Sequence, residues 1–204
     1  MPTYDYLVML VIAVFLIVGA YQFYFFPQRH PARQPREFRS RIDEAIPFRP
    51  GWVWIYSFLY YPAILVLVFL MASASQFIYT AFSFLVLMGM QLVFFFFFPV
   101  TTPKRWRDYE LHTGWSVRFL RFVHSFDAQS NCFPSMHVSV ATLTAHHMFQ
   151  NLSEMFGLLA IAAYLFPALI GISTVYTKQH YLADVPAGVI LGNVSYDAYL
   201  VLTG

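Results

Sequence analysis

The chain has 204 residues, of which 59% are hydrophobic and only 11% are charged. Soluble domains carry about 25% charged residues, so this composition excludes an ordinary soluble fold and indicates an integral membrane protein. The net charge of +2 suggests no nucleic-acid partner. The single cysteine, Cys132, excludes both an internal disulfide and a thiolate metal cluster.

Six apolar segments predict an all-α membrane protein, a six-helix bundle forming one domain over residues 1–204. About 20 apolar residues, each rising 1.5 Å, cross a hydrocarbon core of roughly 30 Å. The fourth and sixth segments also carry polar residues, which in lipid must face the bundle interior or a wet cavity, so we look for function there. The predicted spans are 6–26, 52–72, 77–98, 134–149, 155–172 and 185–202.

All the Lys and Arg residues fall in three connections, which emerge at one membrane face if the segments cross alternately. These connections are 27–51, 100–133 and 173–184. By the positive-inside rule that face is cytoplasmic and both termini lie on the other side. The residues are Arg29, Arg33, Arg36, Arg39, Arg41, Arg49, Lys104, Arg105, Arg107, Arg118, Arg121 and Lys178.

The connection between the third and fourth spans contains a short amphipathic segment, residues 115–123. It mixes Trp115, Phe119 and Phe122 with Arg118 and Arg121. This pattern predicts an interfacial helix whose arginines reach lipid phosphates, although a plain amphipathic connector fits the same pattern.

The segment 131–137, with sequence Asn-Cys-Phe-Pro-Ser-Met-His, predicts the start of the fourth helix. Pro134 suits a first turn, because the N–H that proline lacks has no helical partner there. The N–H groups of Ser135, Met136 and His137 would then point out of the helix start and favour a bound anion such as phosphate. Ser135 adds a hydroxyl donor and His137 an imidazole that titrates near neutral pH. A plain capping role for this segment is the alternative.

The second group of candidate residues is His180 with Asp184. Four residues apart on a helix, the two side chains share a face, so the carboxylate can accept the imidazole Nδ1–H and leave Nε2 as a nucleophile or base. An inert polar pair at the membrane interface is the alternative. Both groups are predicted at the same membrane face as Lys104, Arg105 and Arg107.

Together these residues are the parts needed to transfer a phosphoryl group without a metal or other cofactor. Cations and backbone N–H groups would hold the charged phosphoryl oxygens. In this scheme His180 attacks phosphorus and His137 protonates the departing alkoxide.

The residues 133–137, followed by His180 and Asp184, resemble the second and third motifs of the type 2 phosphatidic acid phosphatase superfamily. Its members are six-helix membrane enzymes that act on lipid phosphates, and the resemblance covers about residues 101–192. It implies a phosphohistidine at His180, orientation of that ring by Asp184, general acid catalysis by His137 and phosphate binding by Ser135. It also implies a lipid phosphate substrate within the bilayer and an active site on the external or lumenal face, opposite to the face that the charges indicate.

Three departures from the family pattern bear on phosphate binding. Met136 replaces the usual glycine of the second motif, and Thr174 occupies the usual arginine position of the third. The first motif is matched only loosely around Lys104 and Arg105. We therefore expect Arg105, then Lys104, to bind the phosphate, with Lys178 as a substitute for the missing arginine.

With these departures, the second and third motifs resemble those of the superfamily branch that contains the inositol phosphorylceramide synthases. Enzymes of that branch transfer a phospho-head-group between lipids. Simple hydrolysis of phosphatidate or an isoprenyl phosphate shares the same covalent intermediate and is the alternative. A transporter or proton-relay protein is a hypothesis of another class. It is disfavoured because the ionisable residues gather at one membrane face. A structural protein with a decayed site is a further hypothesis.

Other ionisable residues were given no catalytic role. His146 and His147 are predicted at the interface, because nine residues from His137 correspond to roughly 14 Å along a helix. His112 and His124 are predicted in a solvated loop. Asp197 is predicted to be a buried ionisable group in the last span, without an identified partner.

Overall fold

The computed structural model describes residues 2–38, 40–109, 113–126 and 129–204. Arg39 and His112 lie outside these residues. The described chain is almost entirely helical, which confirms the all-α class. Its only sheet pairs two strands of two residues in parallel, β1 (Arg36–Glu37) with β2 (Val100–Thr101).

Five helical runs among the described residues are long and apolar enough to cross a membrane. This confirms the prediction of a membrane protein from length and composition. The runs are Thr3–Arg29, Pro50–Leu70, Ala74–Phe97, Met136–Tyr176 and Asp184–Thr203. The first is α1, the third α5 and the last α9, while the second contains η1 (Pro50–Trp52), α3 (Val53–Phe58) and α4 (Tyr60–Leu70).

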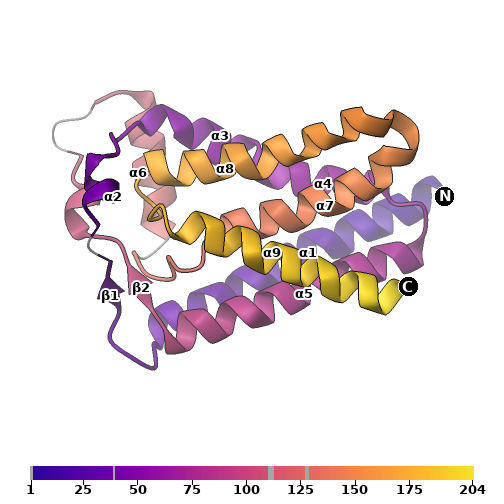
Figure 1. Ribbon diagram of the computed structural model, residues 1–204, viewed down its shortest axis with the longest axis horizontal. Helices are drawn as coiled ribbons and strands as arrows, with labels where there is room; N and C mark the ends of the chain where they lie inside the picture. Colours follow the sequence, from indigo (N-terminus) through magenta and orange to yellow (C-terminus); the bar gives the residue numbers. More distant parts are fainter. Residues whose placement is uncertain (1, 39, 110–112, 127–128) are drawn as a thin grey trace.

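The fourth run has 41 residues and folds back on itself. It consists of α7 (Met136–Phe156), the 3-10 helix η3 (Gly157–Tyr164) and α8 (Leu165–Tyr176), and α8 packs beside α7 (Figure 1). The reversal begins at Gly157, where φ is +54°, and not at residues 150–154, the connection between the fourth and fifth predicted spans. The helix continues through that segment because its polar groups are satisfied. Asn151, for example, donates to the His147 carbonyl and accepts from Gln76.

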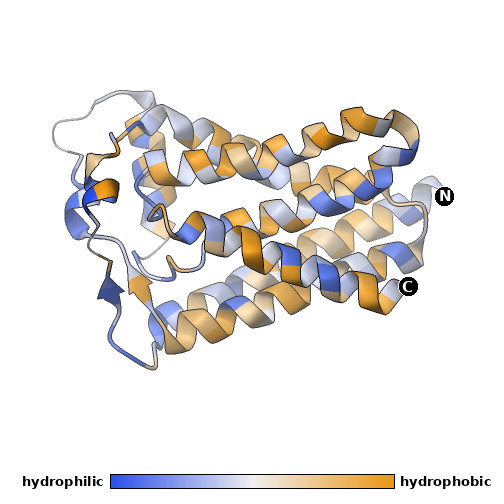
Figure 2. Cartoon of the chain, viewed as in Figure 1, coloured by the Kyte–Doolittle hydropathy of each residue, from blue (hydrophilic) through white to orange (hydrophobic). Residues whose placement is uncertain are grey.

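The long helices lie side by side along one axis (Figure 1). The three longer connections, before α3, between α5 and α7 and between α8 and α9, form a cap at one end, with α2 (Arg41–Ala45), β1, β2 and α6 (Trp115–Phe126), whereas both termini lie at the other end. Figure 2 shows hydrophobic residues along the helix bodies and many hydrophilic ones in the cap. The three connections that carry the positive charge therefore do gather at one end. Residues 115–126 form the helix expected there, whose placement at a membrane surface stays a prediction.

Helix α7 occupies the centre of the bundle and contacts α4, α5, α8 and α9. Its contact with α9 is close because Gly188 and Gly192 face it, four residues apart on α9. A Cβ at Gly188 would lie 2.7 Å from the Ser135 carbonyl oxygen, and one at Gly192 would lie 2.7 Å from the Ser139 carbonyl oxygen. Small residues at this spacing let two helices approach backbone to backbone. The approach brings the start of α7 against the start of α9.

Candidate active site

The turn between α8 and α9, residues 177–183, carries His180. The carbonyl of Thr174, near the end of α8, accepts N–H bonds from Gln179 at 3.0 Å and from His180 at 3.3 Å. Lys178 takes the left-handed conformation with φ +60°, which turns the chain back towards the bundle. Backbone hydrogen bonds within the turn therefore fix the position of the His180 backbone, independently of its side-chain contacts.

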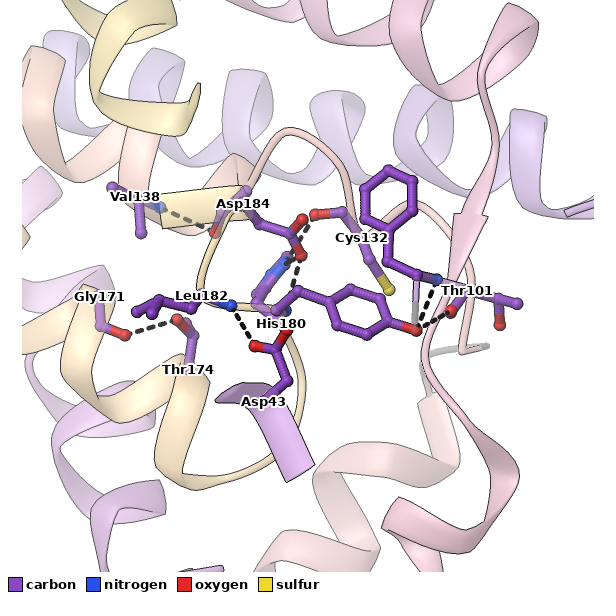
Figure 3. A network of polar contacts seen from close by, with 12 residues as sticks. Asp43, Thr101, Cys132, Val138, Gly171, Thr174, His180, Leu182 and Asp184 are labelled. Atoms are coloured by element: carbon purple, nitrogen blue, oxygen red, sulfur yellow. Dashed lines mark hydrogen bonds and ion pairs between the residues drawn. The ribbon is translucent and has the colours of Figure 1, made fainter. Parts of the chain in front are cut away.

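The His180 side chain is buried and held at one nitrogen (Figure 3). Nδ1 lies 2.8 Å from the Cys132 carbonyl oxygen and 3.2 Å from Oδ2 of Asp184. A carbonyl only accepts hydrogen bonds, so Nδ1 carries the proton. In the neutral ring Nε2 then has a free lone pair, as a nucleophile or base requires.

Asp184 is the first residue of α9 and is fully buried. Its Oδ2 also accepts the backbone N–H of Tyr181 at 2.9 Å, so one carboxylate oxygen orients both the ring and the turn. The sequence predicts that His180 and Asp184 make this contact from the same face of one helix. It is instead made across the turn, because α9 begins only at Asp184.

His137, the second residue of α7, lies next to His180. The centroids of the two imidazole rings are 5.9 Å apart and their planes meet at 65°. The structure thus brings together the two histidines that sequence spacing placed 43 residues apart. His137 also contacts Tyr56 and Tyr60 from the second helical run, two residues that the sequence analysis did not identify.

Ser135 caps α7, and the helix begins at Met136, two residues after the predicted start. The Ser135 side-chain oxygen accepts the Val138 N–H at 3.4 Å. Its backbone N–H donates to the Asp184 carbonyl at 3.1 Å and is not free for an anion, contrary to our expectation. The Ser135 O–H group and the first-turn N–H groups other than that of Val138 are the donors that this helix start offers.

Helix α2 contacts the turn of residues 177–183 through Asp43, another residue without a predicted role. Its Oδ1 accepts the Leu182 N–H at 2.7 Å, and its backbone carbonyl accepts from Nζ of Lys178 at 2.6 Å. Asp43 therefore contacts the residues two before and two after His180. The sequence of this connection indicates only the orientation of the chain in the membrane, through its arginines.

The three cations predicted to bind phosphate contact α2 or belong to η2 (Lys104–Arg107). Lys178 is buried over the Trp106 ring, 4.6 Å from its centroid, and burial lowers the pKa of Lys178. Arg105 pairs with Glu44, and this hydrogen bond holds the pKa of Glu44 below its ordinary value. Lys104 is exposed. Trp106 also packs on Tyr181, so η2 is docked against the turn that carries His180.

The position of the missing third-motif arginine is filled by a small buried side chain. Thr174 is fully buried, and its hydroxyl donates to the Gly171 carbonyl at 2.8 Å. The preceding Ser173 is equally buried and donates to the Ile170 carbonyl. Both hydroxyls are directed to the backbone of their own helix, so neither replaces an arginine that binds phosphate.

An apolar cavity of about 490 Å³ opens beside His137. Its walls come from α1, α3, α4, α5 and α7, with Phe119 and Phe122 of α6 at the capped end. The lining extends along α5 from Gln91 to Phe77, about 21 Å at 1.5 Å per residue. One leaflet of a bilayer is about 15 Å of hydrocarbon, so the cavity is long enough for a lipid chain.

The remaining ionisable residues lie apart from this site, and several differ from expectation. His124 is buried and hydrogen-bonded to Tyr109, so it does not lie in a solvated loop. His147 is fully buried and contacts Ser83 at 3.0 Å, because α7 carries it into the bundle and not to the interface. Asp197 is exposed on α9, whereas we expected it to be buried. No group of three His, Cys, Asp or Glu side chains suited to a metal was found within the described ranges.

Comparison with known proteins identifies the family. No curated protein and no solved structure matches the chain. One family model, described as the PAP2 superfamily, matches residues 42–198, which include Asp43, Ser135, His137, His180 and Asp184. The match covers well over half of the sequence, and the chain therefore belongs to the PAP2 superfamily.

Proposed function

We propose that this protein cleaves a lipid phosphate ester through a phosphohistidine formed on His180. The observation that carries the proposal is the state of the His180 ring, which is held at Nδ1 by Cys132 and Asp184 beside the imidazole of His137. Membership of the PAP2 superfamily supports phosphoryl transfer as the class of reaction.

The reaction needs two steps. In the first, Nε2 of His180 forms a bond to phosphorus while the bond to the lipid oxygen breaks, and His137 gives that oxygen a proton. In the second, His137 takes a proton from water or an alcohol whose oxygen attacks phosphorus and releases His180. Asp184 stabilises the positive charge that develops on the His180 ring. Ser135, the α7 start and the cations Arg105, Lys104 and Lys178 are the proposed phosphate-binding groups.

The cavity beside His137 supports a lipid as the substrate. Its lining is mainly apolar, and it leads from His137 into the part of the bundle that faces hydrocarbon. A phosphate bound at the histidines would therefore place an attached lipid chain against apolar side chains, where burial is favourable by about 0.8 kcal/mol per methylene group.

Transfer of the phospho-head-group to a second lipid is the outcome we propose, with hydrolysis as the alternative. The support is Met136 in the second motif together with the buried Thr174 at the arginine position, since both resemble the inositol phosphorylceramide synthase branch. Both outcomes use the same phosphohistidine and differ only in whether an alcohol or water resolves it.

Assays of the purified protein in mixed micelles test these proposals. We expect release of phosphate from a diacyl phosphatidate or exchange of a head group, with His180→Ala reducing either rate to background. His30→Ala, which removes an exposed histidine at the end of α1, is the matched control. Activity that survives His180→Ala would refute the mechanism. Exchange without release to water would support transfer, and release without exchange would support hydrolysis.

We also propose that the chain crosses the membrane six times, with α7 and α8 as separate crossings, and that the capped end faces the cytoplasm. Both termini lie together at the opposite end, as an even number of crossings requires. The positive charge of the cap supports the cytoplasmic assignment. Labelling a cysteine introduced at Arg36 with a membrane-impermeant reagent tests it, because labelling in intact cells would place the cap outside.

A further inference from the structure

Tyr56 of α3 forms a hydrogen bond with the second histidine of the site. Its hydroxyl oxygen lies 2.6 Å from Nε2 of His137, and the two ring centroids are 4.6 Å apart. The Tyr56 side chain is buried, and Tyr60 packs on the same imidazole at 5.1 Å. The position of the His137 ring is therefore fixed by packing, and one of its nitrogens is already engaged.

The other nitrogen of His137, Nδ1, is buried and has no hydrogen-bond partner in the described part of the chain. The two histidines are thus held at opposite nitrogens, His180 at Nδ1 and His137 at Nε2. The nitrogen of a histidine that is not held by the protein is the one available for chemistry. This arrangement leaves Nε2 of His180 for phosphorus and Nδ1 of His137 for the proton.

We propose that Tyr56 is a positioning residue that holds His137 with a proton on Nε2, so that Nδ1 exchanges protons with the reacting oxygens. The inference rests on the proposed function. In the first step the Nδ1–H bond of the doubly protonated ring breaks and an O–H bond forms on the departing lipid oxygen. In the second step the O–H bond of the incoming water or alcohol breaks and its proton returns to Nδ1. Throughout, Nε2–H donates to the Tyr56 oxygen.

The hydroxyl of Tyr56 distinguishes this role from simple packing. Tyr60 contacts the same imidazole through its ring, so packing alone requires an aromatic residue but no hydroxyl. Tyr56→Phe keeps the ring and removes the oxygen that accepts from Nε2–H. The variant therefore tests the hydrogen bond separately from the shape of the site. Tyr79→Phe, on the exposed surface of α5 and outside the cavity, is the matched control for loss of a phenolic hydroxyl.

The first measurement compares two leaving groups. We expect Tyr56→Phe to lower kcat on a long-chain alkyl phosphate roughly 10- to 100-fold with little change in KM. The loss should shrink to a few-fold on 4-nitrophenyl phosphate, whose leaving group departs without a proton. Tyr79→Phe should match the wild type on both substrates. An active wild-type protein with no loss in Tyr56→Phe, or with an equal loss on both substrates, would overturn the proposal.

The second measurement does not depend on turnover. Long-range ¹H–¹⁵N spectra of the detergent-solubilised protein, assigned with His137→Gln, report which ring nitrogen of neutral His137 is protonated. We expect the Nε2–H tautomer in the wild type and a mixture in Tyr56→Phe. An Nδ1–H tautomer in the wild type overturns the inference even if Tyr56→Phe does not fold. If the wild type shows no activity on any lipid phosphate, the proposed function fails, while the tautomer still decides the role of Tyr56.

Discussion

The carboxylate of Asp43 accepts the backbone N–H of Leu182 at 2.7 Å, which ties the first long connection to the turn that carries His180. The two residues are 139 positions apart in sequence. Asp43 is buried and its backbone carbonyl also accepts from Lys178, so it contacts the turn on both sides of His180. Although α2 has only five residues, it thereby supports the turn that carries the proposed nucleophile.

Replacing Asp43 tests this support. Asp43→Ala removes the charged acceptor of the Leu182 N–H, and a hydrogen bond to a charged group contributes about 1.5–3 kcal/mol of stability. We expect the freed turn to misplace His180 and activity to fall roughly 10- to 100-fold, whereas Asp43→Asn keeps an acceptor oxygen and most of the activity. Thermal unfolding and lipid phosphatase assays on both variants check this. Glu44→Ala, which removes the exposed neighbouring carboxylate, is the stability control. Equal activity in Asp43→Ala and the wild type would show that α2 does not support the turn.

The close contact of α7 with α9 predicts that two glycines tolerate no side chain. Gly188→Ala would place a Cβ 2.7 Å from the Ser135 carbonyl oxygen, a backbone atom that cannot move aside without shifting α7. We expect a loss of about 1–3 kcal/mol in stability and reduced activity, because Ser135 and Asp184 meet at this contact. Gly89→Ala on α5 has open space around its Cβ and should be neutral or slightly stabilising. Melting temperatures in detergent compare the two, and similar values for both variants would refute the close packing.

Burial of His124 predicts a loss of stability in acid. Desolvation lowers the pKa of His124 to about 3, against about 6.5 in the unfolded chain. Between these values the unfolded state binds the extra proton, so the free energy of unfolding falls as the pH falls through this window and is fully retained above pH 6.5. We expect the melting temperature of the wild type to drop more steeply between pH 6.5 and pH 4.5 than that of His124→Gln. The control Ser125→Ala should follow the wild type, and parallel curves for wild type and His124→Gln would contradict the prediction.

Much of the site was predictable because its groups are local in sequence. The pairing of His180 with Asp184 and the start of α7 near Ser135 follow from short spacings, and hydropathy identified the helices that bring them together. Asp43 and Tyr56 were not predictable in this way. Their contacts cross 139 and 81 residues, and neither residue type is unusual in its own segment. Only the packing of α2 against the turn that carries His180, and of α3 against His137, indicates a role for them.

The cavity predicts a preference for long-chain substrates that a single substitution removes. Ala13 of α1 lines the deep part of the cavity and packs near Met71 and Phe77. A phenylalanine there would occupy the space of the distal part of a lipid chain, while the region next to His137 stays open. We expect Ala13→Phe to lower kcat/KM for dioleoyl phosphatidate at least about tenfold, which corresponds to losing the burial of roughly two methylene groups, and to spare dioctanoyl phosphatidate. Val11→Phe adds the same ring to the exposed face of α1 and should leave the ratio of the two substrates unchanged. A ratio unaltered in a folded Ala13→Phe protein would mean that the lipid chain lies elsewhere, because the substitution closes the deep end without contacting the two histidines.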